Sequence, residues 1–136
     1  MTKDDNVFSW GRGEFGRLGH GDELHQFQPV LIETLHHKQV TDISCGGYHS
    51  VALSKSGLVF TWGSGEYGKL GHKDQKDRLV PTIVDAMRKK EVKRILAGVY
   101  VTVAYAFSPC HVEQSFLSRW AATLHEMLPL RFRLGH

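Results

Sequence analysis

The fold of this chain is decided by a glycine-rich stretch that occurs twice. Residues 10–20 read WGRGEFGRLGH and residues 62–72 read WGSGEYGKLGH, so Trp10 matches Trp62 at an offset of 52 residues. The offset needs no insertion or deletion, and it also matches Pro29 with Pro81, Val40 with Val92, and Tyr48 with Tyr100. Periods of roughly 20–50 residues indicate solenoids, propellers or other repeat arrays.

The pattern inside one unit is that of β-strands. Residues 39–44 and 49–54 alternate apolar and polar side chains, residues 55–57 supply a turn, and residues 58–62 form a β-branched and aromatic run. A weaker fourth strand is expected near residues 29–32, beyond a long glycine-rich connection. Four antiparallel strands per unit predict an all-β fold built from the blades of a β-propeller.

The glycine-rich stretch, together with CGGYHSVAL at residues 45–53, resembles the repeat of the regulator of chromosome condensation family. The resemblance covers about Val7 to Phe107. It implies a propeller, which family members typically close with seven blades. Relatives include nucleotide-exchange factors for small GTPases, chromatin-binding proteins, recruiting modules of ubiquitin ligases and a plant ultraviolet-B photoreceptor, so the resemblance alone selects no function.

Counting strands predicts a partial propeller of about two blades. We expect Val7 to Trp10 to be the last strand of a preceding blade, Val30 to Trp62 to be one whole blade, and Thr82 to Ala106 to be three strands of another. A third Trp-Gly is due at residues 114–115, where the sequence is Gln-Ser. We therefore expect a domain over residues 1–107, with repeats at 7–58 and 59–107.

A different pattern begins after the second repeat, and residues 108–136 are predicted to form a divergent helical tail. Ser108 is suited to cap a helix, Pro109 is tolerated in its first turn, and apolar residues then recur at three- and four-residue spacing as far as Leu128. Three interpretations stay open: a helix that covers the open edge of the second blade, a helix for a partner or membrane surface, or a tail from an altered reading frame.

The glycines formally match the G-x-G-x-x-G of dinucleotide-binding proteins, at residues 11–16 and again at 63–68. That fingerprint requires a helix directly after it, and a glycine-rich loop follows instead. Neither copy contains the Gly-Lys-Ser/Thr of a phosphate loop. We expect no cofactor, and we interpret the glycines as residues that permit tight turns.

Histidine and cysteine are interpreted as structural. His20, His49 and His72 lie at repeat-defined positions, which predicts hydrogen bonds in the framework, and His49 in particular is expected to brace neighbouring blades. Cys45 is expected to be buried. Cys45 and Cys110 are far apart and outside any C-x-x-C pair, so no zinc site or disulfide framework is indicated. With no metal or catalytic residues indicated, we expect that the chain is not an enzyme.

The candidate binding residues lie in the loops Glu14 to Phe27 and Glu66 to Leu79. The residues expected to contact a protein partner are Glu14, Phe15, Arg17, Asp22, Glu66, Tyr67, Lys69 and Asp74. One basic cluster is expected to contact phosphate or an acidic partner, and it comprises Arg88, Lys89, Lys90, Lys93 and Arg94.

Composition fits an intracellular protein of cytoplasm or nucleus. The 136 residues are 41% hydrophobic with a net charge of +3, the first residues are polar, and no run approaches the ~20 apolar residues of a membrane span. We expect a non-catalytic interaction module or a fragment of a larger propeller protein. The alternative is an exchange factor or chromatin-binding factor of a small-GTPase pathway, active only in a complete or assembled propeller. Head-to-tail self-association through the incomplete blade is also expected.

Overall fold

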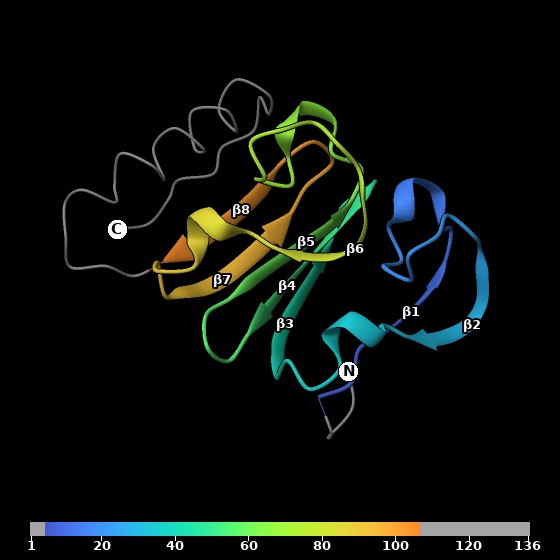
Figure 1. Ribbon diagram of the computed structural model, residues 1–136, viewed down its shortest axis with the longest axis horizontal. Helices are drawn as coiled ribbons and strands as arrows, with labels where there is room; N and C mark the ends of the chain where they lie inside the picture. Colours follow the sequence, from blue (N-terminus) through green and yellow to red (C-terminus); the bar gives the residue numbers. More distant parts are fainter. Residues whose placement is uncertain (1–4, 107–136) are drawn as a thin grey trace.

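The computed structural model describes residues 5–106, and the predicted helix from Ser108 to Leu128 lies outside the described residues. These residues form antiparallel sheets only (Figure 1). The strands are β1 (Phe8–Gly11), β2 (Gln26–Leu31), β3 (Val40–Cys45), β4 (His49–Ser54), β5 (Val59–Gly63), β6 (Arg78–Ile83), β7 (Val92–Ala97) and β8 (Thr102–Ala106). Short 3-10 turns connect some of them: η1 (Glu14–Gly16), η2 (Glu33–Leu35), η3 (Glu66–Gly68) and η4 (Asp85–Met87).

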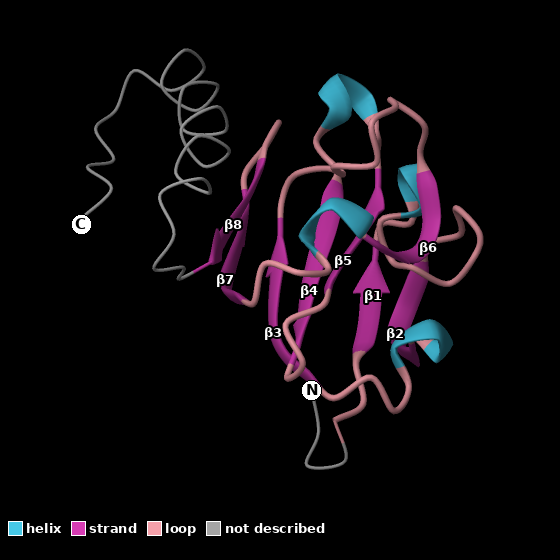
Figure 2. Cartoon of the chain, turned by 60° about the vertical axis from the view of Figure 1, so that its left-hand side comes forward, coloured by secondary structure: helices cyan, strands magenta, loops and turns pink. Residues whose placement is uncertain are grey.

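The sheets are one complete blade flanked by two half-blades. Strands β3, β4, β5 and β6 pair in that order, β1 pairs with β2 on one side, and β7 pairs with β8 on the other (Figure 2). The two inner strands, β4 and β5, are buried along their whole length because a neighbouring strand lies on each side and a neighbouring sheet on each face. This confirms the predicted all-β, partial propeller.

The predicted assignment of strands to blades was wrong in one respect. The strand expected near residues 29–32 exists as β2, but it pairs with β1 and not with the strands that follow it. The complete blade therefore runs from Val40 to Ile83, instead of from Val30 to Trp62, and the last described sheet has two strands, not three. The long loop after each Trp-Gly folds back, so that the strand that follows the loop pairs with the strand that precedes it.

Apolar side chains fill the two spaces between the sheets. The first cluster includes Val7, Ile32, Leu35 and Val40, and the second includes Val59, Val84, Met87 and Val92. Each residue of the second set lies 52 positions after its counterpart in the first (Val59 after Val7, Met87 after Leu35). Each blade-to-blade contact is thus made by the same repeat positions, as in other repeat proteins.

Polar contacts join the complete blade to the half-blade β7–β8. His49 Nε2 lies 2.7 Å from Thr102 Oγ1, and the Ala97 N–H donates to Ser44 Oγ at 2.8 Å. The predicted bracing role of His49 is confirmed. His20 and His72 likewise contact hydroxyls within their own repeats, at 2.9 Å from Ser9 and Thr61 respectively.

The expected burial of Cys45 was wrong. Cys45 is the last residue of β3 and is exposed, because β3 is an outer strand of its sheet and Cys45 ends it at the turn into β4. A small apolar residue is usually buried, but a position at a strand end overrides that preference.

Replacing Ser44 by alanine should leave the Ala97 N–H without its acceptor. We expect the free energy of unfolding to fall by about 1 kcal/mol, since a partly buried N–H donor would lose its hydrogen bond without regaining full hydration. Urea denaturation followed by circular dichroism measures the change. The control is C45A, one residue along the same strand and exposed, which should change stability by less than ~0.5 kcal/mol. Equal effects of S44A and C45A would contradict this role for Ser44.

Candidate interaction surface

The surface is built on two equivalent turns, η1 and η3, that lie at the same end of the sheets (Figure 1). Each turn is only three residues long, and Phe15 and Tyr67 adopt positive φ angles of 60° and 62° within it. A Cβ at Gly13 would collide with the Leu24 carbonyl, and one at Gly65 would collide with the Lys76 carbonyl. The glycines thus allow each loop to close on itself, as expected, and neither turn continues as the helix that a dinucleotide site needs.

Arg17, just after η1, connects the first half-blade to the complete blade. Its backbone carbonyl accepts hydrogen bonds from Trp62 Nε1 at 2.9 Å and from Ser50 Oγ at 3.0 Å. Its guanidinium donates to the Gly47 carbonyl at 3.0 Å and pairs with Glu14 at 2.7 Å. The contact through the backbone was not foreseen from the sequence, in which Arg17 was predicted only as a contact residue for a partner.

Aromatic side chains form one pair across each blade boundary. The rings of Phe15 and Tyr48 meet edge to face with centroids 5.9 Å apart, and those of Tyr67 and Tyr100 meet in the same way at 5.5 Å. The four residues, which we call the aromatic row, are 40–62% exposed. Tyr48 and Tyr100 are 52 positions apart, at the turns β3–β4 and β7–β8. Sequence reasoning missed both, although their matched spacing was visible.

Lys69 is the counterpart of Arg17 in the second repeat, but its surroundings differ. Lys69 is only 2% exposed, and among the described residues its Nζ has no hydrogen-bond partner. The ammonium lies 5.7 Å from the centre of the Tyr48 ring, within the range of a cation–π contact. Burial lowers the pKa of Lys69, with Glu66 and Asp77 opposing that shift. Lys69 supports the aromatic row from beneath and is not available to a partner.

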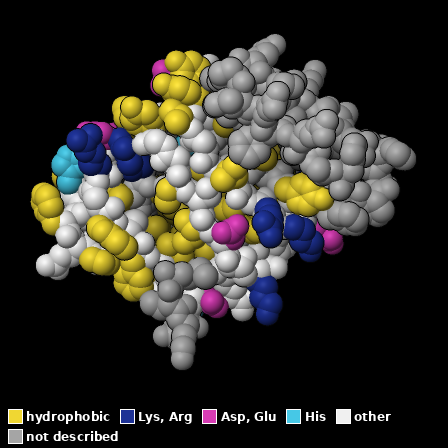
Figure 3. All heavy atoms as spheres, turned by 180° about the vertical axis from the view of Figure 1, so that it is seen from behind, with side chains coloured by type: hydrophobic (Ala, Val, Ile, Leu, Met, Phe, Trp, Pro, Cys, Tyr) yellow, Lys and Arg dark blue, Asp and Glu magenta, His cyan; other side chains and the backbone are white. Residues whose placement is uncertain are grey.

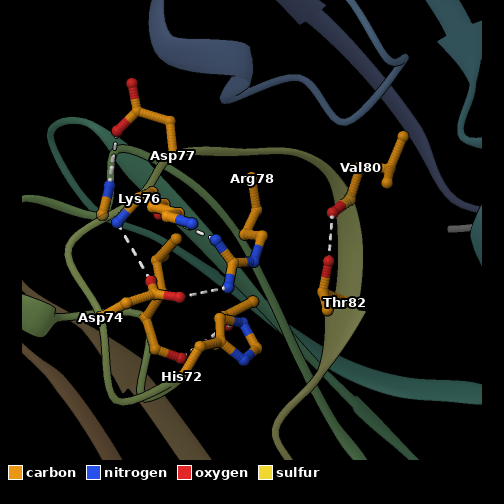
Figure 4. A network of polar contacts seen from close by, with 10 residues as sticks. His72, Asp74, Lys76, Asp77, Arg78, Val80 and Thr82 are labelled. Carbon is orange, nitrogen blue, oxygen red and sulfur yellow. Dashed lines mark hydrogen bonds and ion pairs between the residues drawn. The ribbon is translucent and has the colours of Figure 1, made fainter.

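Asp22 and Asp74 fix the loops behind the turns. Asp74 accepts the Lys76 N–H at 3.0 Å and pairs with Arg78 at 2.8 Å (Figure 4). The hydrogen bond from Arg78 is the main reason that the pKa of Asp74 is lowered. Asp22 makes the equivalent bond to the Leu24 N–H at 3.0 Å. Both carboxylates therefore shape their loops from within.

The two acidic residues at the start of the turns differ in their contacts. Glu14 and Glu66 are both exposed. Glu14 forms an ion pair with Arg17. The described contacts of Glu66 include a hydrogen bond that its backbone N–H donates to Ser64 Oγ at 3.4 Å. Among the predicted loop residues, Glu14, Phe15, Arg17, Glu66 and Tyr67 thus lie on one end of the molecule with at least part of the side chain open.

The basic cluster is separate from this surface. Arg88, Lys89 and Lys90 follow η4, and Lys93 and Arg94 lie on β7, at the opposite end of the sheets from η1 and η3 (Figure 1). Arg88 pairs with Asp85 at 2.6 Å, and Arg88, Lys89, Lys93 and Arg94 are exposed. The structure does not bring the two predicted groups together.

Large apolar side chains are also open on the side that carries β1 and β2 (Figure 3). Phe27 is 94% exposed and Trp10 is 60% exposed. Within residues 5–106, no group of three or more His, Cys, Asp or Glu side chains is placed to hold a metal ion. No helix in that part of the chain is long and apolar enough to cross a membrane.

These features define a section of a β-propeller, in which equivalent turns repeat from blade to blade and present their side chains at one end. A family model described as "Regulator of chromosome condensation (RCC1) repeat" matches residues 4–53 and 56–105. The chain belongs to this repeat family.

Individual relatives are much longer than the matched region. The human E3 ubiquitin-protein ligase HERC2 is 45% identical over 98 residues, which are 72% of this chain and 2% of HERC2. The ultraviolet-B receptor UVR8 of Arabidopsis thaliana is 41% identical over 99 residues, 72% of this chain and 22% of the receptor. This chain therefore spans a small part of the relatives it matches.

Solved structures agree on the fold. The crystal structure of human WBSCR16 aligns with a TM-score of 0.67 at 31% identity, over 79% of this chain and 28% of that one. Prp20p from Saccharomyces cerevisiae aligns with a TM-score of 0.69 at 19% identity, over 93% of this chain and 32% of Prp20p. The second likeness concerns the fold alone.

Proposed function

We propose that the chain is a non-catalytic protein-interaction module, or a section of a larger RCC1-like propeller, that binds a protein partner through the turns η1 and η3. The observation that carries the proposal is the aromatic row, with rings 40–62% exposed at one end of adjacent sheets. Aromatic residues and arginine are enriched in protein interfaces, and Arg17 lies 5.2 Å from the Tyr48 ring within this row.

A purely structural role for the row accounts for only part of its geometry. Edge-to-face pairs stabilise the contact between blades by about 0.5–1.5 kcal/mol. The part of each ring that stays exposed to water adds nothing to that stability. The pair is repeated at both boundaries, and Glu14, Arg17 and Glu66 lie in or directly after the two turns that carry one ring of each pair. An apolar centre with a charged rim is the usual anatomy of a protein interface.

The test is binding of the immobilised chain to a panel of purified small GTPases and to core histones, measured by surface plasmon resonance. The variant F15N/Y67N removes two rings and keeps a residue that tolerates positive φ. We expect partner affinity to fall about tenfold or more. The control F27T removes a ring that is 94% exposed on β2, outside the row, and should bind as the wild type does. Unchanged affinity of F15N/Y67N would refute the assignment of this surface.

The second candidate is an exchange factor or chromatin-binding factor. It is favoured by the exposed basic cluster after η4, because lysine and arginine that contact phosphates supply sequence-independent affinity. The structure of Prp20p is described together with its binding properties to Gsp1p and histones. Release of bound nucleotide from each GTPase separates an exchange factor from a binder, and a steep loss of nucleosome affinity with salt tests the basic cluster. Cytoplasm or nucleus is the location we propose for either role.

Head-to-tail self-association belongs to the same proposal. It is supported by the half-blades at each end of the described chain, since an open sheet edge is a template for another strand. Self-association and partner binding use different parts of the molecule, so they can be tested separately.

A further inference from the structure

The first aromatic pair of the row holds a cation from its own repeat. The guanidinium of Arg17 lies 5.2 Å from the centre of the Tyr48 ring and 6.0 Å from that of Phe15, and it pairs with the Glu14 carboxylate at 2.7 Å. It also donates to the backbone carbonyls of Glu14 and Gly47, each at 3.0 Å. Two rings, a carboxylate and two carbonyl oxygens therefore surround one guanidinium.

The second repeat presents the same kinds of group. By the 52-residue offset, the rings are Tyr67 and Tyr100, the carboxylate is Glu66, and the carbonyl that corresponds to Gly47 belongs to Val99. The two rings meet edge to face, as the first pair does. Tyr67 is 62% exposed, Tyr100 is 45% exposed, and Glu66 is exposed as well. We call these four residues the second turn site.

The cation that the offset predicts for the second turn site lies elsewhere. Lys69 corresponds to Arg17, but its ammonium lies 5.7 Å from the ring of Tyr48 and not over the second pair. Tyr48 thus contacts two cations, whereas in the described part of the chain no cation lies over Tyr67 or Tyr100. Because Lys69 is only 2% exposed, its side chain is held in that place by packing.

The polar groups of the second turn site are also open. Glu66 is close enough to Lys69 to oppose the lowering of the lysine pKa, yet none of the ion pairs among the described residues includes Glu66. No hydrogen bond within the described chain is accepted by the Val99 carbonyl. The second turn site therefore has every component of the first site except its cation.

We propose that the second turn site binds an arginine side chain of the protein partner. A guanidinium suits it better than an ammonium does, because its planar fork of donors can stack on a ring and donate to a carboxylate and a carbonyl at once. The first site shows this arrangement with Arg17. The inference rests on the proposed function and specifies its chemistry: the partner presents an exposed arginine in a basic segment.

A role limited to bracing the blades would need the two rings but not the acidic residue beside them. The first site is already filled by Arg17, so a cation from a partner is expected to enter the second site alone. One arginine per chain is therefore the expected stoichiometry.

The probe is N-acetyl-arginine methylamide, titrated into the full chain with 13C-labelled tyrosine rings and followed by NMR. The chain has four tyrosines, and we expect saturable shifts of Tyr67 and Tyr100 but not of Tyr105. The citrulline analogue keeps the shape without the charge and should bind about tenfold more weakly or worse. The lysine analogue should bind about threefold more weakly or worse. Equal affinity for arginine and citrulline overturns the proposal, and equal affinity for arginine and lysine overturns the choice of arginine.

Two variants with matched controls locate the probe. E66Q removes the carboxylate charge and should weaken arginine binding about threefold or more. E33Q makes the same change at an exposed glutamate of η2, outside the aromatic row, and should bind as the wild type does. Y100L removes one ring and should weaken binding about threefold or more. Y105L is its control, because Tyr105 on β8 is 43% exposed, close to the 45% of Tyr100. Wild-type affinity of either E66Q or Y100L overturns the proposal.

Removing the internal cation gives a test by gain of binding. R17A should vacate the first site, so the probe is expected to bind a second time and to shift the resonance of Tyr48. The backbone carbonyl that accepts from Trp62 and Ser50 is retained in this variant. A Tyr48 resonance that does not respond to the probe in R17A would contradict the equivalence of the two sites and overturn the proposal.

The outcomes separate this site from the function it rests on. Loss of partner affinity in F15N/Y67N, with no effect of E66Q on the probe, would keep the aromatic row as an interface and overturn the arginine site. Partner affinity that is unchanged in F15N/Y67N, with the expected effects on the probe, would refute the proposed function and leave the second turn site as a site for guanidinium.

Discussion

The variant W62A is expected to lose about 3–5 kcal/mol of unfolding free energy, the range found when a large buried aromatic is truncated in a core. Trp62 is 2% exposed and packs with Ile32, Val40 and Phe60 between the first half-blade and the complete blade. Truncation would leave a cavity there and remove one of the two hydrogen bonds that the Arg17 carbonyl accepts, the other coming from Ser50 Oγ. Chemical denaturation followed by far-ultraviolet circular dichroism measures the loss without relying on tryptophan fluorescence.

The repeat offers an internal control for this experiment. Trp10 occupies the equivalent position in the first repeat but is 60% exposed. At a concentration where the chain is monomeric, W10A should change stability by less than ~1 kcal/mol, as most exposed substitutions do. Equal losses for the two variants would mean that burial by the neighbouring turn does not determine the contribution of this tryptophan.

Acidification should destabilise the fold through His49. Burial, and secondarily the charge of Lys69, lowers the pKa of His49 from 6.5 to about 4. The folded state thus favours neutral imidazole, while the unfolded state takes up a proton at the ordinary pKa. Stability from this group is fully present above pH 6.5 and is lost as pH falls toward 4, by about 3 kcal/mol in total at 1.36 kcal/mol per pKa unit.

The variant H49Q isolates this contribution. Glutamine keeps an amide that can contact Thr102 Oγ1 but does not titrate, so its stability should fall less between pH 6.5 and 4. Unfolding free energies of both proteins are measured by urea titration at several pH values across this range. Carboxylates titrate in both proteins and cancel in the difference. Parallel pH profiles for wild type and H49Q would contradict the assignment to His49.

The positions of the strands were predictable, but the pairing of one of them was not. The alternation over residues 49–54 predicted β4 with the bounds that the structure has. A weaker strand was expected near Pro29, beyond the glycine-rich connection, but a sequence pattern says where a strand lies and not which strand it pairs with. The loop that closes over Gly13 decides which strand pairs with β2. That closure is a feature of backbone geometry, and in the sequence only the spacing of the glycines indicates it.

The sequence predicted which loops form the candidate site, but it did not predict which side chains of those loops are exposed. Arg17 and Lys69 occupy matching repeat positions, yet the side chain of Arg17 keeps some exposure to solvent, whereas Lys69 is buried beneath Tyr48. Sequence assigns both to a loop and predicts exposure, because lysine is rarely buried. What reverses this for Lys69 is its packing beneath Tyr48 at the β3–β4 turn of the same blade, a contact between residues distant in sequence that no local pattern encodes.

The stagger between the 52-residue unit and the sheet has a consequence for how such chains can grow. Every blade boundary is crossed by the covalent backbone in the middle of a unit, so β1–β2 corresponds to the second half of a blade and β7–β8 to the first half. A gene duplication that inserts one unit adds one blade wherever its breakpoints fall, because each new half-blade lies next to the half-blade that completes it. Recombination within the array therefore need not respect any domain boundary.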